Sequence, residues 1–80
     1  MNVQNSVVPA LERALNIIEY IAAHNEPVTL KQITSDLHIP SASAFRLIKN
    51  LVTRGYVSEN TDGHMTYILG SKFMSIASSY

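Results

Sequence analysis

The chain has 80 residues, of which 46% are hydrophobic, and it carries six basic and six acidic side chains but no cysteine. This composition is typical of one small folded domain, and it excludes a disulfide framework or a thiolate metal site, which fits a reducing cytosol. The first eight residues lack the basic stretch and apolar run of a secretory signal, and no apolar run could cross a bilayer.

The formal net charge of zero argues by itself against nucleic acid, because nucleic-acid-binding domains are usually basic. The acidic residues are unevenly placed, however, and none lies between Leu37 and Ser58. That stretch holds Arg46, Lys49 and Arg54. The charge is therefore polarised along the chain, with its cationic part on a predicted helix.

The first predicted helix covers residues 9–23. Pro9 suits a first helical turn, where its missing N–H has no partner anyway. Apolar residues recur at the spacing of one helix face at Leu11, Ala14, Leu15, Ile18, Ile21 and Ala22. Ile17 and Tyr20 widen this stripe, which suggests burial on two sides, by the rest of the domain or by another subunit. The helix ends before Pro27, because the residue preceding a proline avoids the helical region.

A second helix begins with a strong local signal. Thr29 and Gln32 have the spacing of a capping box, and Val28 and Ile33 occupy the positions of a hydrophobic staple. The buried face of this helix consists of Leu30, Ile33 and Leu37. Residues 38–40, with the sequence His-Ile-Pro, break the helix and make a turn.

The third helix covers about residues 41–54 and opens at Ser41 or Ser43, either of which can cap it. Its core-facing residues are Ala44, Leu47, Ile48 and Leu51. Because a helix turns about 100° per residue, the opposite side carries Ala42, Arg46, Lys49 and Thr53. Phe45 lies at the edge of that side, and Gly55 suits the position that follows a helix end.

A short strand over residues 56–59 and a return strand over 64–69 predict a β-hairpin. The turn between them contains Asp62-Gly63, a specific hairpin signal. The residues that share one face of the return strand are Met65, Tyr67 and Leu69.

Ser71 can cap a last helix, whose helical spacing runs through Phe73, Ile76, Ala77 and Tyr80. This helix stops in mid-pattern, so we expect the chain to be the front end of a longer protein. The elements together predict a mainly helical fold with a small β-hairpin. This is a winged helix-turn-helix with a three-helix core, a two-stranded wing and the start of a C-terminal helix, an arrangement that reads DNA.

Four segments carry a family resemblance: LERAL at 11–15, IPSASAFRLI at 39–48, RGYV at 54–57 and YILG at 67–70. In this order they resemble the first helix, the recognition helix, and the entry and exit of the wing in the IclR family of bacterial transcription regulators. The resemblance covers the chain from Val8 onward. The family often has a basic residue at Ser41, a hydroxyl at Ala42 and His or Tyr at Phe45, so these departures bear on the DNA sequence preferred.

The resemblance implies a flexible arm over residues 1–8, a DNA-binding domain over 9–70 and the start of a linker helix over 71–80. It also implies a larger domain, absent from this chain, that would bind a small-molecule effector. Such proteins act as dimers or dimers of dimers, here through the first helix and the linker helix. We expect double-stranded DNA as the partner, and neither a cofactor nor a membrane.

Arg46 is the strongest candidate for a DNA contact, because its guanidinium can form two parallel hydrogen bonds to guanine or hold a phosphate. Ser41 and Ser43 can bind a phosphate at the helix N-terminus, or simply cap the helix. Phe45 could contact a thymine methyl group, although we favour a core aromatic side chain. Lys49 and Thr53 suit phosphate contacts, and Lys49 could equally be a solvated charge.

Thr29 and Lys31 begin the helix that crosses the DNA backbone in this motif, although Thr29 is required as a cap. Ala42 lies on the exposed face of the recognition helix. His64 at the wing tip could reach the minor groove, but wings usually do this with Arg or Lys, and Asp62 beside it repels phosphate.

An enzyme is disfavoured. His24, His38 and His64 stand in separate contexts without metal-ligand spacing, and no phosphate-binding loop or nucleophile motif is present. The alternative to a DNA reader is a winged-helix module for protein contacts, because fold alone does not fix function. Net neutrality favours that alternative, and the stretch without acids opposes it. Salt-dependent DNA binding separates the two.

Overall fold

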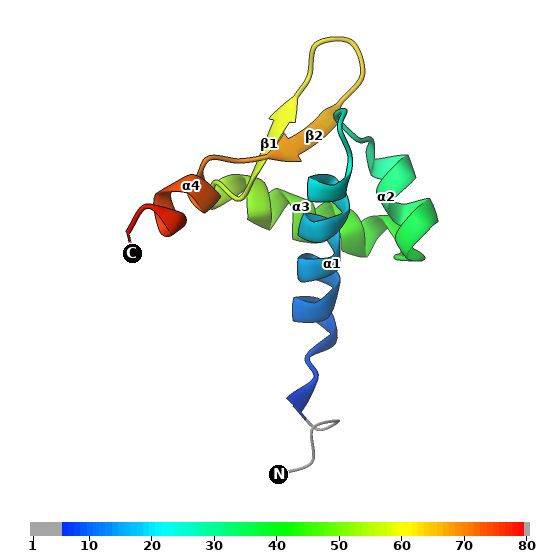
Figure 1. The fold of residues 1–80 in the computed structure, drawn as a ribbon. Coiled ribbons are helices and arrows are strands. Elements are labelled where there is room, and N and C mark those ends of the chain that lie inside the picture. The colour runs from blue at the N-terminus through cyan, green and yellow to red at the C-terminus, as the bar shows by residue number, and fades with distance from the viewer. Residues whose placement is uncertain (1–5, 80) are drawn as a thin grey trace.

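The computed structural model describes residues 6–79 (Figure 1). In chain order, the elements of this part are α1 (Pro9–Ala23), α2 (Leu30–Leu37), α3 (Ser41–Thr53), β1 (Val57–Asn60), β2 (Thr66–Leu69) and α4 (Lys72–Ala77). The predicted fold class is confirmed, with a helical body and one antiparallel hairpin as the wing. Most of the predicted N-terminal arm, residues 1–5, and Tyr80 lie outside the described residues.

Helix α1 begins with Pro9 in its first turn, as predicted, but the core covers only part of its apolar stripe. Ile17 and Ile21 are its buried residues, whereas Leu11 and Leu15 are 54% and 42% exposed. The first turns of α1 extend past the rest of the domain, so apolar side chains there meet no core (Figure 1). Of the predicted stripe, Ile21 and the widening residue Ile17 are therefore buried by this domain, whereas Leu11 and Leu15 are not, and their burial by another subunit stays a prediction.

Local signals place the helix-turn-helix correctly. The capping box is present, because the Thr29 hydroxyl accepts the Gln32 N–H at 3.1 Å and the Gln32 side chain accepts the Thr29 N–H at 2.8 Å. His38 ends α2 in the left-handed region at φ 55°, and Ile39 beside it is buried. This turn redirects the chain into α3 within two residues.

The predicted cap of α3 is wrong. Pro40, at φ −56° and ψ 140°, occupies the N-cap position, so Ser41 is already helical and Ser43 lies inside the first turn. No side chain of residues 6–79 caps this helix. Proline fixes its own φ near the value that a helix start requires, so it sets the boundary that the serines were expected to set.

Backbone hydrogen bonds join the end of α3 to the residue that follows the return strand of the wing. Gly55 adopts φ +85°, and Tyr56 N–H donates to Leu51 at 2.9 Å, which satisfies a carbonyl of the last helical turn. Gly70 N–H then donates to the Tyr56 carbonyl at 2.9 Å. A methyl group on Gly70 would overlap the Gly55 carbonyl oxygen, so the two backbones approach as closely as glycine allows.

The hairpin pairs Val57 with Leu69 and Glu59 with Tyr67. Its return strand begins at Thr66, two residues later than predicted, because the turn is longer. Asp62 N–H donates to the Asn60 side chain at 2.9 Å and Gly63 adopts φ +77°, which shapes a loop over residues 61–65. Val28 and Tyr67 exchange backbone hydrogen bonds at 3.1 and 2.8 Å, so the segment before α2 joins the sheet edge.

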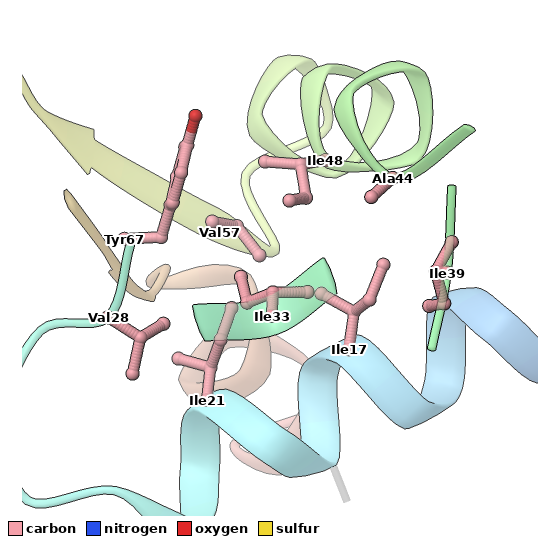
Figure 2. Packing of buried hydrophobic residues seen from close by; sticks show 9 residues of the cluster. All are labelled: Ile17, Ile21, Val28, Ile33, Ile39, Ala44, Ile48, Val57 and Tyr67. Atoms are coloured by element: carbon pink, nitrogen blue, oxygen red, sulfur yellow. The ribbon is translucent and has the colours of Figure 1, made fainter. Parts of the chain in front are cut away.

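One cluster of nine side chains forms the core of the described part (Figure 2). It consists of Ile17, Ile21, Val28, Ile33, Ile39, Ala44, Ile48, Val57 and Tyr67. Tyr67 has the largest fully buried side chain, although it comes from the wing. Burying each large apolar side chain contributes about 1.5–3 kcal/mol, so every element that supplies one is needed.

Helix α4 contributes no buried residue. The half-buried Phe73 packs its ring edge-on against Tyr56, with centroids 5.3 Å apart. The predicted Ser71 cap is wrong, because Ser71 has helical backbone angles and makes no cap hydrogen bond within residues 6–79. This short helix is therefore held by one aromatic contact and by the Lys72 N–H, which donates to Gly55 at 3.1 Å.

Candidate nucleic-acid interface

The outer face of α3 is open to solvent. Ala42, Arg46 and Thr53, which lie opposite the core residues Ala44 and Ile48, are all exposed. Within residues 6–79, no ion pair or side-chain hydrogen bond holds the Arg46 guanidinium. The predicted face is therefore present, and near its middle lies a cation that is unpaired within the described range.

Phe45 borders this face and is 43% exposed. The interpretation of Phe45 as a core aromatic is therefore wrong. Its position one residue past the core residue Ala44 turns it away from the interior, since each residue rotates the helix by about 100°. The exposed ring adds an apolar surface beside Arg46.

The first turn of α3 presents unsatisfied backbone donors. Ala44 N–H makes the first helical hydrogen bond, to Pro40 at 3.0 Å, so the N–H groups of Ser41, Ala42 and Ser43 precede the helical ladder. With Pro40 as the N-cap residue, no side chain in the described range covers them. These donors and the helix dipole suit an anion, and Ser41 and Ser43 lie beside them.

Lys49 is not a free charge. Its Nζ atom lies 3.1 Å from Glu59 Oε2 and 3.2 Å from Oε1, and 5.6 Å from the centroid of the Phe45 ring. The pair links α3 to β1, ten residues further along the chain. Thr53 is also engaged, because its hydroxyl donates to the Lys49 carbonyl at 3.0 Å. A phosphate would have to compete with Glu59 for Lys49.

Two of the predicted DNA contacts lie at the start of α2, and only one of them has a side chain free of the helix cap. The Thr29 hydroxyl is occupied by the capping box, whereas the Lys31 side chain is exposed. The loop with His64 is exposed too, and it projects away from α3 at the far end of the hairpin (Figure 1). The structure thus gathers the α3 residues on one face and leaves His64 apart.

Arg13 is a residue that the sequence interpretation missed. A surface hollow of about 250 Å³ lies between α1 and α3. It is lined by Ala10, Arg13, Ser43, Arg46, Leu47 and Asn50. In the sequence Arg13 is only one polar residue on an amphipathic helix, and only the packing of α1 against α3 places it beside Arg46.

A polar contact braces α1 against α2. The Tyr20 hydroxyl donates to Asp36 Oδ2 at 2.6 Å, and this hydrogen bond to a carboxylate raises the pKa of Tyr20 above 10.0. His24 Nδ1 lies 2.7 Å from the Tyr20 carbonyl, to which a protonated Nδ1 donates.

Residues 6–79 contain no group of three or more His, Cys, Asp or Glu side chains placed to hold a metal.

A scan against protein-family models matches residues 10–61 to the IclR helix-turn-helix domain. Among solved structures, the Agrobacterium tumefaciens repressor BlcR is 27% identical, with a TM-score of 0.79 over 91% of this chain and 29% of that chain. An IclR family transcriptional regulator from Brucella abortus is 19% identical, with a TM-score of 0.80 over 99% of this chain and 30% of that one.

An IclR transcriptional regulator from Alicyclobacillus acidocaldarius is 20% identical, with a TM-score of 0.83 over 90% of this chain and 29% of that chain. The chain therefore spans less than a third of the length of each of these three proteins. No curated protein matches it in sequence. Among the described residues, none of the helices has the length and apolar character to cross a membrane.

Proposed function

Because the chain belongs to the IclR helix-turn-helix family, the DNA-binding domains of transcription regulators, we propose that it reads duplex DNA with α3 in the major groove. The observation that carries this proposal is the outer face of α3, which is open and presents Arg46, whose side chain has no ion-pair partner among residues 6–79. In a helix-turn-helix, the second helix contacts base edges and the first crosses the backbone.

Arg46 is the proposed base reader, with guanine O6 and N7 as its acceptors. Ala42 and the exposed Phe45 ring suit apolar contacts to thymine methyl groups. Ser41 and Ser43, beside the free N–H groups of the first turn, suit a backbone phosphate.

The remaining contacts are proposed with the DNA backbone and the minor groove. Lys31 and Thr29 start α2, which would lie across a strand. Thr53 and Lys49 would meet phosphates at the wing side of α3, Lys49 only when it leaves Glu59. His64 would reach the minor groove from the hairpin loop.

We also propose that the domain acts as a homodimer or a higher oligomer. The exposed apolar side chains of α1 and α4 support this, among them Leu11 and Leu15, and Met74, which is 77% exposed. A symmetric dimer would place its two α3 helices in half-sites about 34 Å apart, one helical turn of DNA.

The proposed organisation is an N-terminal arm, a DNA-binding domain over residues 9–70 and a linker helix that starts near residue 71. The larger size of the solved regulators supports a second domain, which would bind a small-molecule effector. The effector would then change the spacing of the two recognition helices.

Fluorescence anisotropy with duplex DNA from the region upstream of the coding sequence tests the function. We expect affinity to fall steeply with salt, because phosphate contacts release counterions, and to exceed that for a scrambled duplex. Equal affinity for both duplexes would contradict sequence reading.

A protein-contact module is the second candidate, favoured by the zero net charge and by the exposed apolar side chains of α1 and α4. Absence of DNA binding at low salt, together with self-association in analytical ultracentrifugation, would support this candidate over the first. Phosphate contacts weaken with salt, whereas apolar protein contacts mostly do not.

A further inference from the structure

We infer that the hollow between α1 and α3 binds a backbone phosphate of duplex DNA, with Arg13 as a DNA contact outside the helix-turn-helix. The inference rests on the proposed function and extends the interface onto the first helix. Arg13 and Arg46 are the charged residues in the lining, and both are cationic.

Neither cation has an acidic partner in the part of the chain that the structure describes. The ion pair of the described residues is that of Lys49 with Glu59, and within residues 6–79 no hydrogen bond engages the Arg13 or Arg46 guanidinium. Two like charges that share a hollow without an acid repel each other, and an anion between them removes that repulsion. The hollow therefore has the charge that a phosphate requires.

The remaining lining is suited to a phosphate as well. Ser43 supplies a hydroxyl and belongs to the uncapped first turn of α3, and Asn50 lies two turns further along the same side. The volume of about 250 Å³ exceeds that of a cavity known to hold benzene, about 150 Å³, so a phosphate group fits.

We expect this phosphate to come from a DNA strand, because the hollow is continuous with the outer face of α3. Arg46 and Ser43 belong to both, so a strand beside α3 passes the hollow when α3 lies in the groove. Arg46 then faces the base edges, and Arg13 on the α1 side of the hollow holds the phosphate. This contact would fix the angle at which α1 and α3 meet the strand.

The test compares the wild-type chain with Arg13→Gln, Arg13→Lys and Arg54→Gln on the upstream duplex and on a scrambled duplex. Arg54 is an exposed arginine at the opposite end of α3, outside the hollow, so its variant controls for loss of one charge. Arg13→Gln should weaken binding by the same factor on both duplexes, because phosphate contacts carry no sequence information.

The salt dependence gives the second readout. One lost phosphate contact lowers the slope of log affinity against log salt by about 0.9, so raising salt from about 50 to about 200 mM should weaken the wild type roughly threefold more than Arg13→Gln. Arg13→Lys should retain most of the wild-type slope, since it retains the charge. Circular dichroism melts should coincide, because Arg13 is exposed.

If Arg13→Gln and Arg54→Gln have equal slopes while the wild type binds DNA, the inference is overturned and the proposed function stands. If the wild type binds neither duplex, the inference and the proposed function both fail. Titration with inorganic phosphate, followed through the arginine Nε–H signals in nuclear magnetic resonance, separates the sources. If inorganic phosphate shifts the Arg13 signal but Arg13→Gln does not change DNA binding, the hollow binds a free anion. The inference that it binds a DNA phosphate is then overturned.

Discussion

At the scale of single residues, the two cations on the outer side of α3 differ in what holds them. Arg46 is unpaired among the described residues, whereas Lys49 lies within 3.2 Å of both oxygens of Glu59. Charge alone would rank them equally as DNA contacts. The structure leaves the Arg46 side chain without an ion pair within residues 6–79, whereas Lys49 can contact another anion only after its ion pair with Glu59 breaks.

Arg46→Ala should weaken binding to the preferred duplex by about 1–3 kcal/mol if the guanidinium reads a base. The loss should shrink when the guanine that it reads is replaced, since the variant cannot sense that base. Anisotropy titrations of both proteins on both duplexes measure this as a double-mutant cycle. An equal loss on every duplex would make Arg46 a phosphate contact only.

Glu59→Gln should strengthen DNA binding, because it frees Lys49 for a phosphate. The salt slope should steepen by about 0.9 when one more phosphate is contacted. Asp62→Asn removes the same charge from the hairpin loop, where Asp62 makes no ion pair within residues 6–79, and serves as the matched control. Equal effects of the two variants would mean that only net charge matters and that Lys49 stays with Glu59.

Several residue-level roles depend on tertiary contacts that a sequence does not display. Lys49 and Glu59 are in different elements, and Arg13 lines the same hollow as Arg46 only because α1 packs against α3. Helix periodicity correctly placed Arg46 outward, since that property depends on α3 alone. Phe45 was misassigned because an edge position on a helix can turn to either side.

At the scale of elements, the boundaries that were predicted correctly are those with a local chemical cause. The capping box begins α2 and Gly55 follows α3 in the left-handed region, both as the sequence indicates. The exposure of Leu11 and Leu15 could not be predicted from the spacing in α1, because it depends on how far the helix extends past the core. The longer wing loop was missed because Asp62-Gly63 also fits a two-residue turn.

Gly70→Ala should destabilise the fold, because its methyl group would overlap the Gly55 carbonyl and separate the two ends of the wing. Overpacking of this kind costs typically about 1–3 kcal/mol. Chemical denaturation followed by circular dichroism measures the loss. Gly63→Asn is the control: that site is open, and Asn tolerates the left-handed region. A Gly70→Ala protein as stable as wild type would contradict the close approach.

At the scale of the whole molecule, nine side chains from five elements and two connecting segments hold the described part together. Ile48→Ala should cost about 2–5 kcal/mol, because Ile48 is fully buried between the elements. Leu47→Ala should cost less, since Leu47 is only partly buried. Denaturant midpoints of the two variants test the order, and a larger loss for Leu47 would mean that the phase of α3 is wrong.

Two tyrosines link stability to high pH. Hydrogen bonding to Asp36 raises the pKa of Tyr20, and burial together with the Glu59 charge raises the pKa of Tyr67. Both stabilise the fold fully below pH 10.0, the ordinary pKa, and this stabilisation is lost as pH rises through the raised values. The melting temperature should therefore fall above that pH, and less steeply in Tyr67→Phe. Thermal melts with tyrosinate absorbance check this, and an unchanged alkaline profile in Tyr67→Phe would exclude Tyr67 as the cause.

The burial of Tyr67 has a consequence for synthesis. A nascent chain that has left the ribosome only as far as Asn60 contains all of α1, α2 and α3 but lacks the largest fully buried side chain of the core. It also lacks the strand that pairs with Val28. Helix α3 therefore has its complete set of packing partners only after translation has passed the wing, so a prematurely terminated chain lacks a completed domain.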